Sequence, residues 1–113
     1  MNDMNYVCIN TKIFGNRKMK IIKAMPKGKD YIVFWIQLLC LAGEANRDGW
    51  VSLTQSRDYT TAELSIITDT HEETILEALD VFKDLNMIRR FGDRIYIRNW
   101  MRHQFDMEEE DSE

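Results

Sequence analysis

The chain has 113 residues, of which 44% are hydrophobic, 11% are aromatic, 15 are Lys or Arg and 19 are Asp or Glu, giving a net charge of −4. This is the size of one domain with one core, and the composition excludes a disordered chain, a collagen and a disulfide scaffold.

No apolar run approaches the roughly 20 residues that a membrane-spanning helix needs, and the first residues lack the basic and apolar regions of a signal peptide. The two cysteines, Cys8 and Cys40, predict reduced thiols in a cytosolic protein.

Acidic residues are concentrated at the C-terminus, where Asp or Glu occupies six of the last eight positions. The body of the chain, residues 1–105, is therefore mildly basic. We expect one folded domain over 1–105, followed by residues 106–113 as an acidic segment that does not pack. The sequence leaves open whether this segment is a tail or the start of a linker to a second domain.

The N-terminal quarter is basic, with seven Lys or Arg and no acidic residue between positions 12 and 29. Asn16 is a good N-cap for a short helix over 17–25, and residues 6–9 are expected to form a short strand. The inner side of the helix is expected to carry Ile21, Ile22 and Met25. Its outward-facing cations are Lys18, Lys20 and Lys23.

Residues 31–42 form the most apolar segment, with Gln37 as the one polar side chain after Tyr31. Such a length predicts a helix, and a helix that is apolar all round must be buried all round. Two arrangements are open: a core helix wrapped by its own chain, or a helix that also meets a second subunit. In the second case the predicted oligomer interface is Phe34, Trp35 and Leu38.

The middle of the chain predicts a turn over 46–49, a strand over 50–53, and two helices joined by a tight connection. Each helix begins at a predicted capping box, Thr60 with Glu63 and Thr70 with Glu73. The first helix is expected over 61–68 with Leu64 and Ile67 buried. The second is expected over 71–85, with an apolar stripe of Ile75, Ala78, Leu79, Phe82 and Leu85. This arrangement is a helix-turn-helix pattern.

A hairpin is expected after the second helix. Asn86 suits the left-handed position that ends a helix, and Gly92 suits the first central position of a type II′ turn between two alternating strands. Ile95 and Ile97 are expected on one face of the hairpin and Tyr96 on the other. A helix-turn-helix followed by a two-stranded hairpin predicts an α+β, mostly α, winged helix with an extra N-terminal segment.

Several strings resemble the N-terminal domain of phage replisome organisers, related to DnaD-like primosomal proteins. They are YVCINTKIF (6–14), MKIIKAMPKGKDYIVFWIQLLCLAGEAN (19–46), DGWVSL (48–53), YTTAEL (59–64), ALDVFKDLNMIRRF (78–91) and IYIRNWMRHQ (95–104). The resemblance implies a cytoplasmic replication-initiation protein in a bacterial host, which acts at a phage origin and helps to recruit a helicase or helicase loader. It also implies further sequence after this domain, because the family is usually longer than 113 residues.

The charge of the second predicted helix makes it unfavourable for contact with the DNA major groove. It carries Glu72, Glu73, Glu77, Asp80 and Asp84 against a single cation, Lys83. Pointing these carboxylates into a phosphate-lined groove is repulsive. Only Thr70, His71 and Thr74, near the start of the helix, are candidate contacts.

The cations lie elsewhere and predict DNA contact through the wing and the basic N-terminal helix, without strong sequence preference. The predicted DNA-binding residues are Arg89, Arg90, Arg94, Tyr96, Arg98 and Arg102 on and after the wing, and Lys18, Lys20 and Lys23 before it. Two other interpretations stay open. The cations are ordinary solvated faces, or the domain is an oligomerisation and protein-docking module with DNA binding elsewhere in the protein.

The remaining chemistry-bearing residues predict no catalytic, cofactor or metal site. Cys8, Cys40, His71 and His103 lack the spacing of zinc ligands, and the five glycines form no phosphate-binding loop. The three tryptophans, Trp35, Trp50 and Trp100, are each expected in the core. The sequence thus predicts a binding protein rather than an enzyme.

Overall fold

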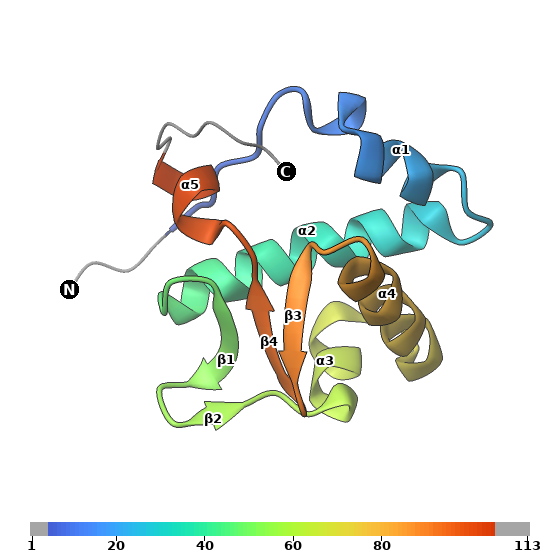
Figure 1. Ribbon diagram of the computed structural model, residues 1–113. Coiled ribbons are helices and arrows are strands. Elements are labelled where there is room, and N and C mark those ends of the chain that lie inside the picture. Colours follow the sequence, from blue (N-terminus) through green and yellow to red (C-terminus); the bar gives the residue numbers. More distant parts are fainter. Residues whose placement is uncertain (1–4, 106–113) are drawn as a thin grey trace.

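The computed structural model describes residues 5–105, except the side chains of His103 and Phe105, and shows an α+β fold in which about half of these residues are helical (Figure 1). In chain order the elements are η1 (Ile13–Gly15), α1 (Arg17–Lys23), α2 (Gly28–Ala45), β1 (Trp50–Thr54), β2 (Arg57–Asp58), α3 (Thr61–Thr68), α4 (Glu72–Asp84), β3 (Ile88–Phe91), β4 (Arg94–Ile97) and α5 (Trp100–Phe105). The predicted acidic segment, 106–113, lies outside the described residues.

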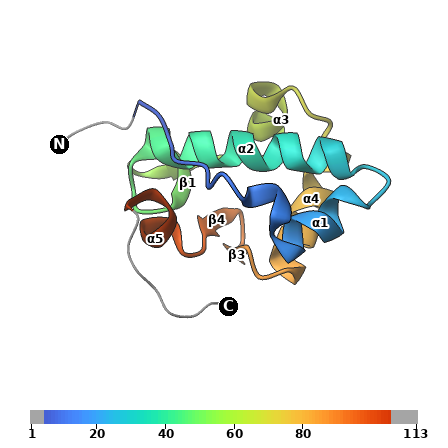
Figure 2. The same ribbon diagram turned by 90° about the horizontal axis from the view of Figure 1, so that it is seen from above.

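Helix α2 organises the domain. Seen from above, it lies between α3 on one side and the β3–β4 hairpin with α5 on the other (Figure 2). It packs against α1, β1 and α4. The predicted helix over 31–42 is confirmed, and the structure extends it to Gly28–Ala45. It is not buried all round, because Val33 is 56% exposed and Cys40 is exposed.

The three α2 side chains predicted for an oligomer interface are buried within this single chain. Phe34 and Leu38 are fully buried and Trp35 is 8% exposed within this single chain. Phe82 of α4 packs on two of them, stacked on Phe34 at 6.4 Å between ring centroids and edge-on to Trp35 at 5.0 Å. Because α1, β1 and α4 bury most of α2, one chain suffices to cover these three side chains.

The N-terminal segment differs from its prediction. Residues 6–9 form no strand. The backbone of Cys8 forms hydrogen bonds with a side chain instead of a neighbouring strand. The Cys8 amide donates to Oε1 of Gln104 at 2.6 Å, and Nε2 of Gln104 donates to the Cys8 carbonyl at 3.1 Å. This amide clip fastens the start of the domain to α5, which the sequence did not predict.

Helix α1 begins as predicted, since the Asn16 side chain accepts hydrogen bonds from the backbone amides of Lys18 and Met19. It ends at Lys23, two residues earlier than expected. Ile22 is buried, but Ile21 is half exposed, and Met19 takes the inner position instead. Met25 packs at the edge of the core.

The four strands form one antiparallel sheet in the order β2-β1-β4-β3. Before β1, the predicted turn is present, and Gly49 adopts φ +106°. A Cβ at this position would lie 2.7 Å from that of Trp100, so only glycine allows the turn to pass beside α5. The short strand β2 was not predicted, because two residues give no periodic signal.

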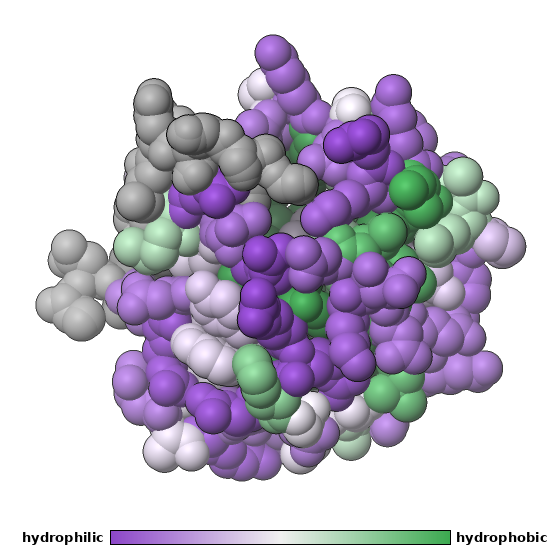
Figure 3. Space-filling view, viewed as in Figure 1, coloured by the Kyte–Doolittle hydropathy of each residue, from purple (hydrophilic) through white to green (hydrophobic). Residues whose placement is uncertain are grey.

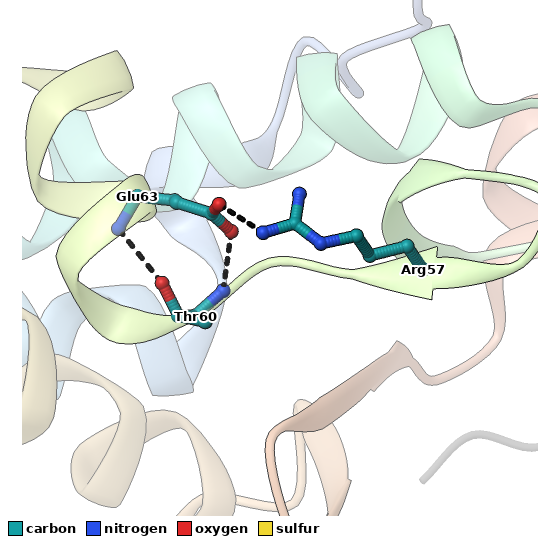
Figure 4. Close-up of polar contacts among 3 residues, drawn as sticks. All are labelled: Arg57, Thr60 and Glu63. Carbon is teal, nitrogen blue, oxygen red and sulfur yellow. Dashed lines mark hydrogen bonds and ion pairs between the residues drawn. The ribbon is translucent and has the colours of Figure 1, made fainter.

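Helix α3 has the predicted bounds and the predicted capping box (Figure 4). The Glu63 amide donates to the Thr60 hydroxyl at 3.1 Å, and the Thr60 amide donates to the Glu63 carboxylate at 3.0 Å. Arg57, from β2, pairs with the same carboxylate. These contacts hold the pKa of Glu63 below its usual value, the Thr60 backbone hydrogen bond being the largest cause and the Arg57 pair the next. Leu64 is buried as predicted, whereas Ile67 is 48% exposed.

The second capping box is absent, because α4 starts one residue later than predicted, with His71 as its N-cap. The Thr70 hydroxyl instead donates to the Thr68 carbonyl at 3.0 Å, at the end of α3. The apolar stripe of α4 is confirmed. Ile75, Ala78, Leu79 and Phe82 are buried, and Leu85 packs at the edge of the core.

The hairpin after α4 forms as predicted. Asn86 has φ 62°, and the amides of Asn86 and Met87 donate to the carbonyls of Lys83 and Phe82, which closes a Schellman motif. Gly92, with φ 67°, occupies the turn between β3 and β4. The inner face of the hairpin, with Ile88, Ile95 and Ile97, completes the core.

Candidate nucleic-acid interface

The outer face of the sheet carries three aromatic rings from three strands. The register pairs Trp50 of β1 with Tyr96 of β4 and sets Phe91 of β3 opposite Arg94. The Trp50 ring lies 5.0 Å from that of Tyr96 and 5.9 Å from that of Phe91, measured between centroids. Trp50 and Tyr96 are half-buried, and Phe91 is 53% exposed.

These rings line a shallow hollow of about 390 Å³, together with Arg89, Arg98 and Asn99. We call this surface the aromatic hollow. Side-chain alternation explains it, because the neighbours of its residues along each strand point inward to the core. Figure 3 shows the front of the molecule as mostly hydrophilic, with separate apolar patches among the polar side chains.

The arginines in and beside the hollow differ in the contacts that their guanidinium groups form. Arg89 is exposed and forms no ion pair with a residue that the structure describes. Nη1 of Arg98 donates to the Asn86 carbonyl at 3.0 Å. The guanidinium carbon of Arg94 lies 4.5 Å from the centre of the Trp50 ring, and its Nε is 3.6 Å from Asp58. Arg94 therefore covers part of Trp50, and its charge is partly balanced.

Arg90 is separated from the other arginines. It lies opposite Ile95 in the register and so belongs to the inner side of the hairpin. Its Nη2 donates to the Gly92 carbonyl at 3.2 Å, and its Nε is buried without a hydrogen-bond partner among the described residues. Of the β3 and β4 residues predicted to contact DNA, Arg90 is thus the one on the inner side of the hairpin.

A second concave surface connects the two basic regions that the sequence placed far apart. This groove, of about 1170 Å³, is lined by Lys18 from α1, by Arg98 and by Arg102 from α5. Arg98 belongs to both the groove and the hollow. Lys20 and Lys23 are exposed on α1 outside both surfaces, and the Lys23 amine lies 5.7 Å from the centre of the Phe14 ring.

The acidic helix α4 has a structural role that explains part of its charge. Lys27 donates to Glu77 at 2.5 Å, and the Tyr31 hydroxyl donates to the same carboxylate oxygen at 3.1 Å. These bonds lower the pKa of Glu77, with the Lys27 hydrogen bond as the main cause, and the Glu77 bond raises the pKa of Lys27. Burial is the main reason that the pKa of Tyr31 is raised. Glu77 therefore ties α4 to the start of α2.

The other acids of α4 are exposed. Glu72 and Glu73 occupy its first turn, where carboxylates interact favourably with the helix dipole. Asp80 and Asp84 lie farther along. His71 is exposed at the N-cap and Thr74 is buried, so of the predicted contacts near the helix start His71 alone is fully accessible.

Sequence reasoning placed Trp50 in the core, together with Trp35 and Trp100. The structure confirms the other two, at 8% and 2% exposure, but Trp50 lies on the outer face. The alternation of the strand places Trp50 and Val51 on opposite faces, but the sequence does not show which of the two faces inward. The pairing of Trp50 with Tyr96 shows that Trp50 lies on the outer face.

The described residues contain two free, exposed cysteines, Cys8 and Cys40. Within 5–105, no three His, Cys, Asp or Glu side chains gather in a way that suits a metal ion. Likewise, no helix in the described part of the chain has the length and apolar character to cross a membrane.

Fold and surface together define a small α+β domain with a long central helix, α2, two helices joined by a short connection, α3 and α4, and a sheet face that carries arginines and aromatic rings. The chain belongs to the N-terminal phage replisome organiser family, whose model matches residues 6–113. The family assignment agrees with the resemblance seen in the sequence. No curated protein matches the chain, and neither does any solved structure.

Proposed function

We propose that this domain is a winged helix that contacts DNA during phage replication initiation, through the β3–β4 wing and the basic region of α1. The order α3, α4, β3, β4, with β1 paired to β4, supports this interpretation of the fold. The domain performs no chemistry in this role. It binds the DNA of a phage origin region with low sequence preference, in the cytoplasm of the bacterial host.

The observation that carries the proposal is the continuity of the cationic surface. Arg89 and Arg98 border the aromatic hollow, and Arg98 also borders the groove that contains Lys18 and Arg102. Cations from α1, β3, the link between β4 and α5, and α5 therefore follow one path across the molecule. A row of cations along such a path suits a phosphate backbone, whose contacts need charge at regular intervals rather than a specific base edge.

The acidic face of α4 indicates that the wing, rather than the second helix, approaches the DNA. Glu73, Asp80 and Asp84 are exposed on α4. Placed in a major groove, each would face phosphates, at a cost of about 1 kcal/mol for every close pair even in water. An orientation that turns α4 away from the duplex avoids this repulsion.

The test is a titration of a labelled duplex with the wild-type protein and with Arg89→Gln/Arg98→Gln, followed by fluorescence anisotropy at several salt concentrations. Glutamine keeps a donor for the Asn86 carbonyl. We expect about tenfold weaker binding at low salt, and a salt slope reduced by about two.

The matched control is Lys29→Gln/Lys83→Gln, which removes the same charge from α2 and α4, outside the hollow and the groove. Its affinity is expected to stay within about twofold of wild type, because long-range charge effects are screened. Equal losses in both variants, or no binding by the wild-type protein, would contradict wing contact.

A second candidate function is docking of a protein, which would be another copy of this chain, a helicase or a helicase loader. The observation that favours it is the exposure of two consecutive isoleucines at the end of α3, Ile66 at 80% and Ile67 at 48%. Exposed apolar side chains that adjoin one another mark interaction sites more often than isolated ones. Light scattering of the wild-type protein and of Ile66→Ser/Ile67→Ser tests it. If the wild-type protein is monomeric at high concentration, docking of a second copy of this chain is excluded.

A further inference from the structure

We propose that the aromatic hollow binds single-stranded DNA by stacking unpaired bases on its rings, with Arg89 and Arg98 on the flanking phosphates. This inference rests on the proposed DNA contact and deepens it, because it names the form of DNA that the sheet face takes. The candidate surface is Trp50, Phe91 and Tyr96 with their neighbouring arginines and Asn99.

The first argument is that the core does not need these rings. The inner faces of the same strands supply Val51, Ile88, Ile95 and Ile97, each at most 3% exposed. The sheet is therefore closed on its inner side by aliphatic residues. Cross-strand aromatic pairs stabilise a sheet by only about 0.2–1 kcal/mol each. A structural role thus accounts for one such pair, but not for three rings gathered around an open hollow.

The second argument is chemical. Bases in a duplex are stacked on one another and present no free π face, whereas every base of a single strand has one. If a duplex lay over the hollow, the rings that line it would meet only sugar and phosphate. Rings flanked by cations instead suit a strand whose bases turn inward while its phosphates lie outside.

The third argument is that side chains around the hollow are already placed to contact a base or a phosphate. Arg94 lies over Trp50 at 4.5 Å and is oriented by Asp58 at 3.6 Å. A guanidinium plane held in this way offers a further stacking surface. Arg89 is exposed with no ion pair in the described part of the chain, so its charge is available to phosphate. Asn99 supplies an amide at the rim that can both donate to and accept from a base edge.

The fluorescence of the protein provides a direct readout. Trp35 and Trp100 are 8% and 2% exposed, while Trp50 is half-buried on the sheet surface. A base that stacks on Trp50 should therefore quench the intrinsic emission, and the Trp50→Phe variant should lose this response while keeping a stacking ring. Binding through phosphates alone should leave the emission nearly unchanged.

The experiment compares three labelled probes of equal length: an oligo-dT strand, an abasic strand with the same phosphates, and a blunt duplex. Wild type is expected to bind oligo-dT about tenfold or more tightly than the abasic strand. Trp50→Ala and Phe91→Ala should each weaken oligo-dT binding, by about fivefold or more, and leave duplex binding within twofold. The control is Leu53→Ala, which alters an exposed apolar residue of the same strand, β1, outside the hollow.

The outcomes separate the two proposals. Equal affinity for oligo-dT and the abasic strand would overturn stacking, while duplex binding that depends on Arg89 and Arg98 would leave wing contact standing. Absence of binding to every probe would overturn both. If the wild-type protein self-associates and Trp50→Ala makes it monomeric without any DNA effect, the hollow is a protein interface. Phe91→Ala, at an exposed position near the hairpin turn, keeps the test valid if Trp50→Ala does not fold.

Discussion

The outer surface of α4 and the outer face of the sheet are the two surfaces that a helix-turn-helix with a hairpin can present to DNA, and they carry opposite charge. Helix α4 exposes Glu73, Asp80 and Asp84, whereas the sheet exposes Arg89 beside aromatic rings. The same chain order can therefore serve different docking modes. Element order alone does not identify the contact surface, and the charge on each face has to be placed in space.

The inner sides of the two regions also differ. Helix α4 packs into the centre of the domain, where Phe82 meets Phe34 and Trp35. The β3–β4 hairpin places only its inner face in the core and leaves its outer face open. We infer that α4 mainly stabilises the fold and that the outer face of the hairpin is available to contact DNA.

The largest expected effect concerns this stabilising role. Phe82→Ala removes a fully buried ring that touches two aromatic residues of α2, so the free energy of unfolding should fall by about 3–5 kcal/mol. Denaturant titration followed by circular dichroism measures it. Leu76→Ala, at a 46% exposed position of the same helix, is the control and should change stability by less than about 0.5 kcal/mol. Similar losses in both would contradict the view of α4 as a packed element.

A smaller effect is expected from Glu77→Gln, which breaks the ion pair between α4 and α2. Both side chains of this pair are more than one-third exposed, so the loss of stability should be well below that of Phe82→Ala. Because Lys27 and Tyr31 lower the pKa of Glu77 below its usual 4.5, the stabilisation is present above that pH. It is lost as the pH falls through the lowered pKa.

The measurement is thermal unfolding of both proteins from neutral pH to about pH 3. The difference in Tm between wild type and Glu77→Gln should shrink as Glu77 becomes protonated. A difference that is constant over this range would show that the pair contributes through packing rather than charge.

The smallest expected effect is on DNA affinity and concerns the outer surface of α4. If the wing makes the contact, Asp80→Asn/Asp84→Asn should change duplex binding by less than about twofold at physiological salt, since exposed charges beyond a Debye length of roughly 8 Å are screened. A tenfold gain in affinity would place α4 beside the phosphates. The DNA-contacting surface would then be α4 rather than the sheet. Anisotropy on the same duplex makes the two results directly comparable.

Local patterns in the sequence predicted much of the fold. The capped helix at 61–68, the left-handed Asn86 and the Gly92 turn were all correct because each depends on residues a few positions apart. Features that depend on distant partners were missed. A strand was expected over residues 6–9, but the backbone of Cys8 bonds instead to the side chain of Gln104, 96 positions away.

The candidate site was predictable in composition but not in arrangement. Charge counting singled out the arginines of the wing, yet only the register reveals that Arg90 faces inward while Arg89 shares a face with Tyr96. Likewise, the apolar pattern left open whether Phe34, Trp35 and Leu38 are covered by their own chain or by a second subunit. The burial of all three within one chain depends on how α4 and β1 pack against α2, which hydrophobic periodicity does not specify.

The clip between Cys8 and Gln104 has a mechanical consequence. Since two amide hydrogen bonds of 2.6 and 3.1 Å join Cys8 to Gln104 of the last helix, a displacement of either residue is transmitted to the other. A change that moves α5 is therefore expected to pull on the segment that precedes η1, although the two lie at opposite ends of the described chain.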